Sequence, residues 1–551
     1  MHAYRAQMQL FVYAKKSLQP RITNVQQSVE NTGFLHVFPN KGGILVTMQV
    51  DGTSLAFISC HLSAHEGVKH CEERNASIYE IFGGVRAGDV RFDVAEQSHH
   101  LFWMGDMNYR TTYDSEHLPA NTKKNIKTMN STAATPGTSG SASPAPRKHA
   151  HEDSEEEEEA EEDGDKAGEK ARKKKEWTAN RRQTMEMIVQ ERWGDILALD
   201  ELNREIKAGR VFDGFTALQP HWPPTFKRTR QNAINHAMAM GALKPNPLLK
   251  DKNQRSSSRM WVLGAEDAAA EIAVGRFYDD KRMPSYTDRI LSHSMPAFSP
   301  PVPLFFDSCE RPPSSDHKPV RAGYELNLTK GHAGLLVDKQ LLRWKGTVSK
   351  KTSGSRSDAH VLRLTLSQLR GENLEEMDAA MFGGGSDPYI VLTADPPGAM
   401  LHKGTLSGAY DGITSKVVKH DLNPVWKEDM HCMLSSIDLA GLCRTSSLIL
   451  SVWDQDTMNA DDLIGVCSIP LKDIIHSHTQ GNDLFFKKTL HSNTEVMGSL
   501  MGKVTIDGDF KDLIIAYNKL ESERGNSDTF IPLDEALRMA DHTHGCACTL
   551  S

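Results

Sequence analysis

Histidine, aspartate and asparagine occur in several short motifs among the first 325 residues. Three of these motifs are SCHLSAH at 59–65, WMGDMNYR at 103–110 and SDHKPV at 315–320. Each lies at the end of an apolar run, where a sheet presents side chains to a cleft. Carboxylates can hold a metal ion or orient a water molecule, whereas histidine and asparagine contact phosphoryl oxygens. The set suits metal-assisted hydrolysis of a phosphate ester.

Basic residues accompany these motifs in NKGG at 40–43, PPTFK at 223–227 and KRMPSYTDRIL at 281–291. A phosphate ester needs such cationic donors, because its phosphoryl oxygens are negatively charged. Any one of these motifs alone is more often a turn than a site. Together and in this order they are specific.

On these motifs the chain resembles the inositol polyphosphate 5-phosphatases, within the DNase I-like superfamily of metal-dependent phosphoesterases. The resemblance covers about residues 8–325 and is interrupted by an insertion. It implies an α+β fold, a four-layered α/β sandwich of the DNase I-like type. It also implies Mg²⁺-dependent hydrolysis of the 5-phosphate of phosphatidylinositol 4,5-bisphosphate or 3,4,5-trisphosphate, or of soluble inositol polyphosphates.

The resemblance implies roles for individual residues. Asp106 and Asn108 match the pair that orients the attacking water, and Asp288 matches an aspartate that orients a neighbouring catalytic group. The catalytic set it implies is His61, Asp106, Asn108, Asp288, Asp316 and His317. The cations expected to bind the substrate are Lys41, Arg110, Lys227 and Arg282.

The chain departs from the family pattern at two places. Phe226 stands where the family usually has tyrosine, so one hydroxyl that would favour the 4-phosphate is absent. Family members also begin with a strand carrying an asparagine and a strand ending in Gln-Glu, whose glutamate is a principal Mg²⁺ ligand. Residues 8–13 match a later strand, and the chain has no equivalent of that glutamate. We therefore expect an N-terminally incomplete catalytic domain, residues 1–325, with an exposed sheet edge.

The elements expected to position these motifs are short strands and a few helices. Apolar and branched residues at 43–50 and 54–60 flank Asp51-Gly52-Thr53 and predict a hairpin. Residues 101–104 predict a buried strand, whereas the spacing of apolar residues over 72–82 and 184–209 predicts helices. No regular βαβ repeat is present, which favours the α+β class.

Residues 116–180 form a low-complexity insertion in this pattern. It contains a Ser/Thr/Ala/Pro/Gly tract, the acidic run EDSEEEEEAEEDGD at 152–165 and the basic run at 170–175. A block of like charge cannot bury apolar area, so we expect a solvated surface loop. A regulatory or partner-binding role is the alternative.

After a linker at 326–358, residues 359–511 alternate as strands and predict an all-β sandwich. SDPYIV, NPVW, VWDQD and DDLIG within it resemble a C2 domain, the calcium- and phospholipid-binding module. Ca²⁺ prefers carboxylate oxygens on loops, and the candidate ligands are Asp378, Asp387, Asp454, Asp456 and Asp462. A bound Ca²⁺ would attract anionic lipid headgroups. The alternative is a sandwich that binds no calcium.

The last segment, 512–551, ends in a CTLS sequence that fits a prenylation signal at Cys548, with Cys546 available for a second lipid. Two lipid signals would give stable anchoring. A His/Cys metal cluster and a chance occurrence of CTLS are the alternatives.

The composition narrows the function classes. A formal net charge of -8 does not favour nucleic-acid binding, and no apolar stretch is long enough to span a bilayer. Eight cysteines with irregular spacing and no apolar leader at the N-terminus favour a reducing compartment. We expect a cytoplasmic protein that is peripheral on the cytosolic face of membranes.

Two other functions stay open. Another phosphodiesterase of the superfamily, such as a nuclease or sphingomyelinase, is disfavoured by NKGG, PPTFK and PSYTDRIL. A catalytically impaired, calcium-dependent membrane adaptor is favoured by the absent glutamate and disfavoured by the presence of Asp106, Asn108 and His317.

Overall fold

The structure is a computed structural model of the whole chain. The residues it describes are 1–6, 8–32, 40–113, 164–229, 243–245, 261–263, 278–309, 315–328, 360–377, 385–396, 399–400, 412–436, 444–456, 460–507, 515 and 518. Within them, no helix combines the length and the apolar composition needed to cross a bilayer.

A six-stranded sheet in the order β3-β4-β5-β6-β10-β7 organises the first part of the chain. Its strands are β3 (Ile22–Asn31), β4 (Gly42–Val50), β5 (Thr53–His61), β6 (His100–Asp106), β7 (Thr216–Ala217) and β10 (Asp288–Ser294). The pair β5–β6 is parallel and the other pairs are antiparallel. The hairpin expected at 43–60 is present, and Asp51 takes the positive φ (53°) that its tight turn requires.

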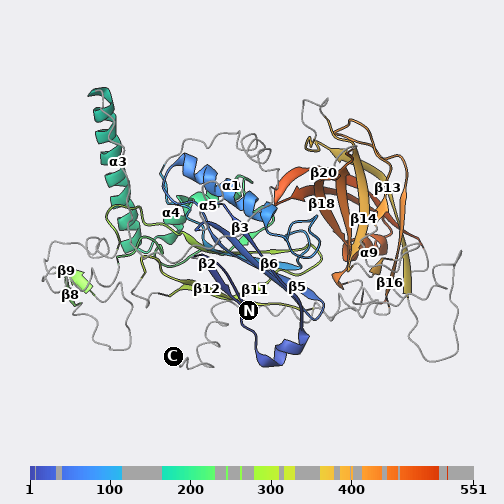
Figure 1. Cartoon of the computed structure of the whole chain (residues 1–551), viewed down its shortest axis with the longest axis horizontal. Helices are drawn as coiled ribbons and strands as arrows, with labels where there is room; N and C mark the ends of the chain where they lie inside the picture. Colours follow the sequence, from blue (N-terminus) through green and yellow to red (C-terminus); the bar gives the residue numbers. More distant parts are fainter. Residues whose placement is uncertain are drawn as a thin grey trace, which may run out of the picture.

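Alternation along the hairpin supplies apolar residues to both faces of this sheet. Leu45 and Ile58 face helix α1 (Val68–Gly84), whose Ile78, Ile81 and Phe82 are fully buried. On the other face, Ile44, Val46 and Met48 pack with residues of the hairpin β1 (His2–Arg5) and β2 (Met8–Phe11). A second hairpin, β11 (Val302–Ser308) and β12 (Val320–Glu325), lies on the same side as β2 (Figure 1). The sheet is thus a central layer covered on both faces.

Three helices cover the end of the insertion and the residues after it: α3 (Gly164–Val189), α4 (Trp193–Ala198) and α5 (Glu201–Lys207). The sequence predicts one helical region at 184–209, and the structure breaks it twice. Helix α3 also reaches back into the part expected to be a solvated loop. Good helix formers explain this extension, and an i,i+4 ion pair between Glu169 and Lys173 supports it. Helix α3 projects from the body of the molecule (Figure 1).

The C-terminal part is an antiparallel β-sandwich whose strands are hydrogen-bonded in the order β15-β14-β17-β18-β19-β20-β13-β16. These strands are β13 (His360–Glu372), β14 (Pro388–Asp395), β15 (Ile413–Thr414), β16 (Met430–Ser436), β17 (Ser447–Asp454), β18 (Asp462–Pro470), β19 (Leu484–Ser492) and β20 (Glu495–Asp507), with helix α9 (Leu471–Thr479) after β18. One apolar core fills it, with Leu364, Leu392, Leu450 and Ile469 fully buried. The expected all-β sandwich is confirmed.

The two parts of the chain are in contact. The ring of Phe92 lies 5.9 Å from the ring of Trp453, and the guanidinium of Arg91 lies 5.8 Å from it. The Asn493 backbone N–H donates to Asp93 Oδ2 at 2.6 Å. Two imidazole–carboxylate pairs join the same surfaces: His99 with Asp395 at 3.0 Å and His491 with Asp213 at 2.7 Å.

Candidate functional site

The register of three adjacent strands brings three predicted residues to one edge of the central sheet. His61 is the last residue of β5 and pairs with Asp106, the last residue of β6. Asp106 in turn pairs with Asp288, the first residue of the antiparallel strand β10. Parallel β5 and β6 end together and β10 begins there, so the three side chains share one edge. Strand pairing thus brings together three residues that are far apart in the sequence.

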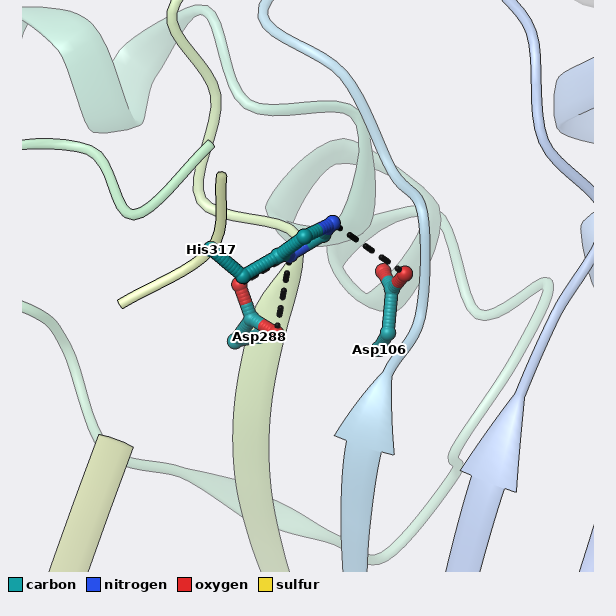
Figure 2. A group of neighbouring side chains, drawn as sticks. All are labelled: Asp106, Asp288 and His317. Carbon is teal, nitrogen blue, oxygen red and sulfur yellow. Dashed lines mark hydrogen bonds and ion pairs between the residues drawn. The ribbon is translucent and has the colours of Figure 1, made fainter. Parts of the chain in front are cut away.

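His317 joins this cluster from the loop before β12. Its Nδ1 lies 3.0 Å from Asp288 Oδ2 and 3.2 Å from Oδ1, and its Nε2 lies 3.8 Å from Asp106 Oδ2. Figure 2 shows the imidazole between the two carboxylates. The hydroxyls of Thr225 and Thr287 also donate to Asp288 Oδ2, at 2.7 and 3.0 Å. These bonds hold the Asp288 carboxylate against the His317 imidazole.

Charge and burial oppose each other at these groups. Burial by itself would raise the pKa of Asp106, but the hydrogen bond with His61 and the charge of His317 outweigh it and lower the pKa. Burial would lower the pKa of His317, but its hydrogen bond with Asp288 and the Asp288 charge raise it. The cluster therefore favours a carboxylate at Asp106 beside an imidazolium at His317.

Lys41 completes the side of the cluster that faces β4. Its Nζ lies 2.6 Å from His61 Nε2, which itself lies 3.4 Å from Asp106 Oδ2. Burial lowers the pKa of Lys41 to about 8, with Asp106 opposing the shift and Arg110 adding to it. The Lys41 side chain and the His61 imidazole thus both stand next to the Asp106 carboxylate.

Asn108 and Arg110 form a buried pair behind Asp106. The Asn108 backbone N–H donates to Asp106 Oδ1 at 3.0 Å, and its side-chain amide donates to the Leu62 carbonyl at 3.0 Å. Arg110 Nη2 donates to Asn108 Oδ1 at 2.7 Å. Asn108 adopts a positive φ of 55°, a conformation asparagine tolerates better than most residues. The amide is therefore held in one orientation at the carboxylate.

Phe226 lies in the wall of the site. The Arg110 guanidinium lies 4.6 Å from its ring centroid, and the His317 ring lies 4.6 Å from it. The segment around Phe226 is hydrogen-bonded to two other site motifs. Phe226 forms an isolated antiparallel β-bridge with Ser285, and the Lys318 N–H donates to the Thr225 carbonyl at 3.1 Å. The PPTFK, PSYTDRIL and SDHKPV motifs therefore form one unit.

Three predicted residues have other contacts. Lys227 Nζ lies 3.7 Å from Asp279 Oδ2, and Arg282 Nη1 donates to the Lys281 carbonyl at 3.3 Å. The Asp316 carbonyl accepts from the Arg228 N–H at 2.7 Å, and the Asp316 carboxylate raises the pKa of His317 as the smallest of several contributions. These residues neighbour the site motifs without joining the Asp106 cluster.

The donor set can accommodate a divalent ion. Among the described residues, Asp106, Asp288 and His317 form the only group of at least three His, Cys, Asp or Glu side chains whose ligand atoms all lie within 4.8 Å of one another. Two carboxylates suit a hard, oxygen-preferring divalent ion. Asp106 and Asp288 are the residues that would hold it.

The residues that support the cluster from behind were not assigned roles from the sequence. Buried Arg74 donates to Glu201 Oε2 at 2.6 Å, and the same oxygen accepts the Arg110 N–H at 2.8 Å. Buried Arg289 pairs with Asp200 at 2.8 Å. Glu201 and Asp200 belong to the segment after the insertion, so their proximity could not be inferred from spacing. One indication of these supporting residues was present in the sequence, which is their position near the site motifs: Arg289 lies within KRMPSYTDRIL and Arg74 follows SCHLSAH.

The candidate calcium ligands of the sandwich lie around one end of strands β14, β17 and β18. Asp387 precedes β14, Asp454 ends β17 and Asp462 begins β18, with Asp456 between them. Asp387 Oδ2 accepts from Lys419 Nζ at 2.6 Å. Asp378, Cys546 and Cys548 lie outside the described residues.

Comparison with known proteins also divides the chain into an N-terminal region and a C-terminal sandwich. Residues 3–134 match the model of Endonuclease/Exonuclease/phosphatase family 2, and residues 362–485 match the C2 domain. The chain joins an endonuclease/exonuclease/phosphatase domain to a C2 domain. The expected fold class, DNase I-like followed by a C2 sandwich, and the resemblance to inositol polyphosphate 5-phosphatases are thereby confirmed.

Individual relatives match over limited lengths. Phosphatidylinositol 3,4,5-trisphosphate 5-phosphatase 2A of Danio rerio is 32% identical over 114 residues, which are 20% of this chain and 9% of that protein. The Homo sapiens 5-phosphatase 2 is 34% identical over 110 residues, 19% of this chain and 9% of that protein. Type IV inositol polyphosphate 5-phosphatase 3 of Arabidopsis thaliana is 24% identical over 223 residues, 40% of this chain and 24% of that protein. The chain thus covers about a tenth of the first two relatives and a quarter of the third.

Two solved structures are also similar. The inositol polyphosphate 5-phosphatase domain of a synaptojanin, in complex with inositol (1,4)-bisphosphate and calcium ion, has a TM-score of 0.33 at 21% identity, covering 59% of this chain and 62% of that chain. A C2 domain of a plant extended synaptotagmin 1 has a TM-score of 0.20 at 18% identity, covering 27% of this chain and 95% of that chain.

Proposed function

We propose that this chain is a Mg²⁺-dependent phosphatase that hydrolyses the 5-phosphate of phosphatidylinositol 4,5-bisphosphate or 3,4,5-trisphosphate. Soluble inositol polyphosphates are further candidate substrates. The observation that carries the proposal is the placement of His317 between Asp288, at 3.0 Å, and Asp106, at 3.8 Å. The matches to inositol polyphosphate 5-phosphatases support the same reaction class.

In this proposal Asp106 orients the attacking water, because its carboxylate stays ionised between two imidazoles. Asn108, fixed by Arg110 and the Leu62 carbonyl, steadies the charge that develops on the phosphoryl group. His317 contacts the scissile phosphate as an imidazolium, since Asp288 raises its pKa. Lys41 supplies positive charge near Asp106 and contacts His61 Nε2 at 2.6 Å.

Mg²⁺ held by Asp106 and Asp288 would offset the negative charge of the phosphoryl oxygens. The same two carboxylates position His317, so the protein prepares the site for both the ion and the phosphate.

Membrane recruitment is the second part of the proposal. The C2 domain would bring the catalytic domain to an anionic bilayer, and lipids on Cys548 and Cys546 would add anchoring. A headgroup would then be cut on the cytosolic face without leaving its membrane. Metabolic labelling with a farnesyl analogue, compared between the chain and its Cys548→Ser variant, tests the lipidation.

The catalytic proposal is tested by phosphate release from phosphatidylinositol 4,5-bisphosphate vesicles with Mg²⁺. We expect turnover by the chain and a loss of about 10³-fold in His317→Ala, because a positioned acid–base group contributes about that much. His70→Ala is the matched control, since His70 contacts Glu73 on α1 rather than the cluster. Inositol 1,4,5-trisphosphate, measured in parallel, separates catalysis from membrane binding.

The outcome also separates the alternatives. A folded chain that hydrolyses neither substrate but sediments with vesicles only when calcium is present would be the adaptor. Hydrolysis of a nucleic acid or sphingomyelin in place of both inositides would indicate another phosphodiesterase.

A further inference from the structure

The acidic end of the C2 domain is crossed by a basic segment of the same chain. Residues 415–421 run beside the start of β14: the Val418 N–H donates to the Pro388 carbonyl at 3.0 Å, and the Asp421 N–H donates to the Ser386 carbonyl at 3.0 Å. These two backbone bonds place the residues between them, Lys419 and His420, against Asp387.

Both carboxylate oxygens of Asp387 are bonded from this segment. Lys419 Nζ lies 2.6 Å from Oδ2, and the His420 backbone N–H donates to Oδ1 at 2.9 Å. Lys419 Nζ also lies 3.3 Å from Gln455 Oε1, and the Gln455 N–H donates to the Asp387 carbonyl at 3.1 Å. The Asp387 side chain is 11% exposed, so the ammonium is held at a largely buried carboxylate.

The neighbouring carboxylates also accept from groups of the protein. Asp454 Oδ1 accepts the Asp387 N–H at 2.6 Å. Asp461 accepts the Tyr389 hydroxyl at 2.6 Å and the Asp456 N–H at 3.1 Å. Among the described residues, no three acidic side chains of this domain lie close enough to share a metal ion. Ca²⁺ needs six to eight oxygen ligands, so the described geometry does not fit it while Lys419 is bonded to Asp387.

We propose that Lys419 takes the position of a calcium ion in this C2 domain, which therefore binds anionic lipid without calcium. The ammonium neutralises Asp387 as a cation would. An ammonium has three N–H donors, and Asp387 and Gln455 account for two of them. Because the Lys419 side chain is 52% exposed, the third can reach a lipid phosphate oxygen.

The test uses the full chain and vesicles of phosphatidylcholine and phosphatidylserine. We expect the vesicle-bound fraction of the unsubstituted chain to differ less than about twofold between 1 mM calcium and a chelator, since calcium up to about that concentration occupies even weak sites. Lys419→Met leaves Asp387 uncompensated. We expect that variant to bind vesicles less in chelator and to gain at least about fivefold with calcium, together with a calcium-dependent rise in Tm.

Lys416→Met is the matched control, because Lys416 lies on the same segment but pairs with Glu428. Lys419→Gln, which keeps a donor for Asp387 and removes the charge, is measured in parallel in case Lys419→Met folds poorly. Calcium-stimulated binding by the unsubstituted chain would overturn the proposal. Indifference of both Lys419 variants to calcium would overturn it as well.

Discussion

Asp106 and Asp387 each lie where a strand meets a loop, and each has a cationic side chain beside it, yet the two regions differ. Asp106 Oδ2 is shared by His61 at 3.4 Å and His317 at 3.8 Å. Asp387 is bonded at 2.6 Å by an ammonium. Imidazoles lose and gain protons near neutral pH, whereas an ordinary exposed lysine keeps its charge there. The first carboxylate therefore lies beside groups that can exchange protons, and the second lies beside an ammonium.

The largest effect is expected when the Asp106 charge is removed. In Asp106→Asn, both imidazoles lose their shared carboxylate and the attacking water loses its acceptor. We expect phosphate release to fall by about 10³-fold or more, because a positioned proton acceptor contributes that much. Steady-state kinetics with inositol 1,4,5-trisphosphate measures it independently of membrane binding.

Asp195→Asn is the control for that variant, since Asp195 is an exposed carboxylate paired with Arg192 on α4. Retention of more than a tenth of the turnover in folded Asp106→Asn would contradict a catalytic role for the carboxylate and remove the contrast with Asp387.

A smaller loss, about tenfold to hundredfold, is expected for Asp288→Asn, the usual cost of removing a group that orients an active-site side chain. Asp288 raises the pKa of His317, so the imidazolium persists to a higher pH than it would alone. The pairing of Asp288 with the His317 imidazolium stabilises the folded state. This stabilisation is complete below the unfolded-state histidine pKa of about 6.5 and is lost as the pH rises through the folded-state pKa of His317.

The pH profile is therefore the diagnostic measurement for Asp288. Without that carboxylate, the alkaline limb of kcat/KM should move to lower pH. An unchanged limb with reduced kcat would show that Asp288 acts on something other than the protonation of His317.

Substitution at Asp387 should act on stability. In Asp387→Asn the Lys419 ammonium loses its charged partner, and we expect the free energy of unfolding to fall by about 1 kcal/mol or less, because the Lys419 side chain is 52% exposed and ion pairs with an exposed partner contribute little. Urea denaturation at low and high salt measures the change. A decrease that persists unchanged at high salt would argue against an ion-pair origin.

The smallest effect is expected for Phe226→Tyr. The added hydroxyl would stand in the wall formed with Arg110 and His317 and could bond a substrate phosphate. One hydrogen bond of about 0.5–1.5 kcal/mol corresponds to a two- to tenfold gain in kcat/KM for a substrate carrying the 4-phosphate. Comparing substrates with and without that phosphate identifies the contact, since an equal gain for both would place the hydroxyl elsewhere.

Local pattern predicted much of this molecule. The hairpin at 43–60, the strand ending at Asp106 and the helix around 72–82 follow from alternation and apolar spacing, which are local properties. The catalytic candidates His61, Asp106, Asp288 and His317 do meet at one sheet edge. Their meeting depends on strand order, which the sequence does not encode locally.

What could not be predicted depends on contacts between distant segments. Glu201 supports Arg110 through one carboxylate oxygen, although 91 residues separate them. Lys419 lies 32 residues from Asp387, and carboxylate spacing alone suggested calcium there. The extension of α3 follows from helix propensity, but its composition resembled a solvated linker. The contacts of the Glu201 and Asp387 carboxylates are thus made by residues from distant segments, which sequence spacing does not reveal.

The contacts between the two domains have a consequence for avidity. Trp453, Asn493 and the two imidazole–carboxylate pairs hold the C2 domain against the catalytic domain. If the C2 domain binds a bilayer, these contacts keep the proposed catalytic domain near the same surface. The effective concentration of substrate at that domain is then set by this fixed geometry and no longer by diffusion from solution. A weak contact of the C2 domain with lipid and a weak contact of the site with a headgroup would together give a high affinity of the chain for the membrane. The chain would dissociate more easily once either contact is lost.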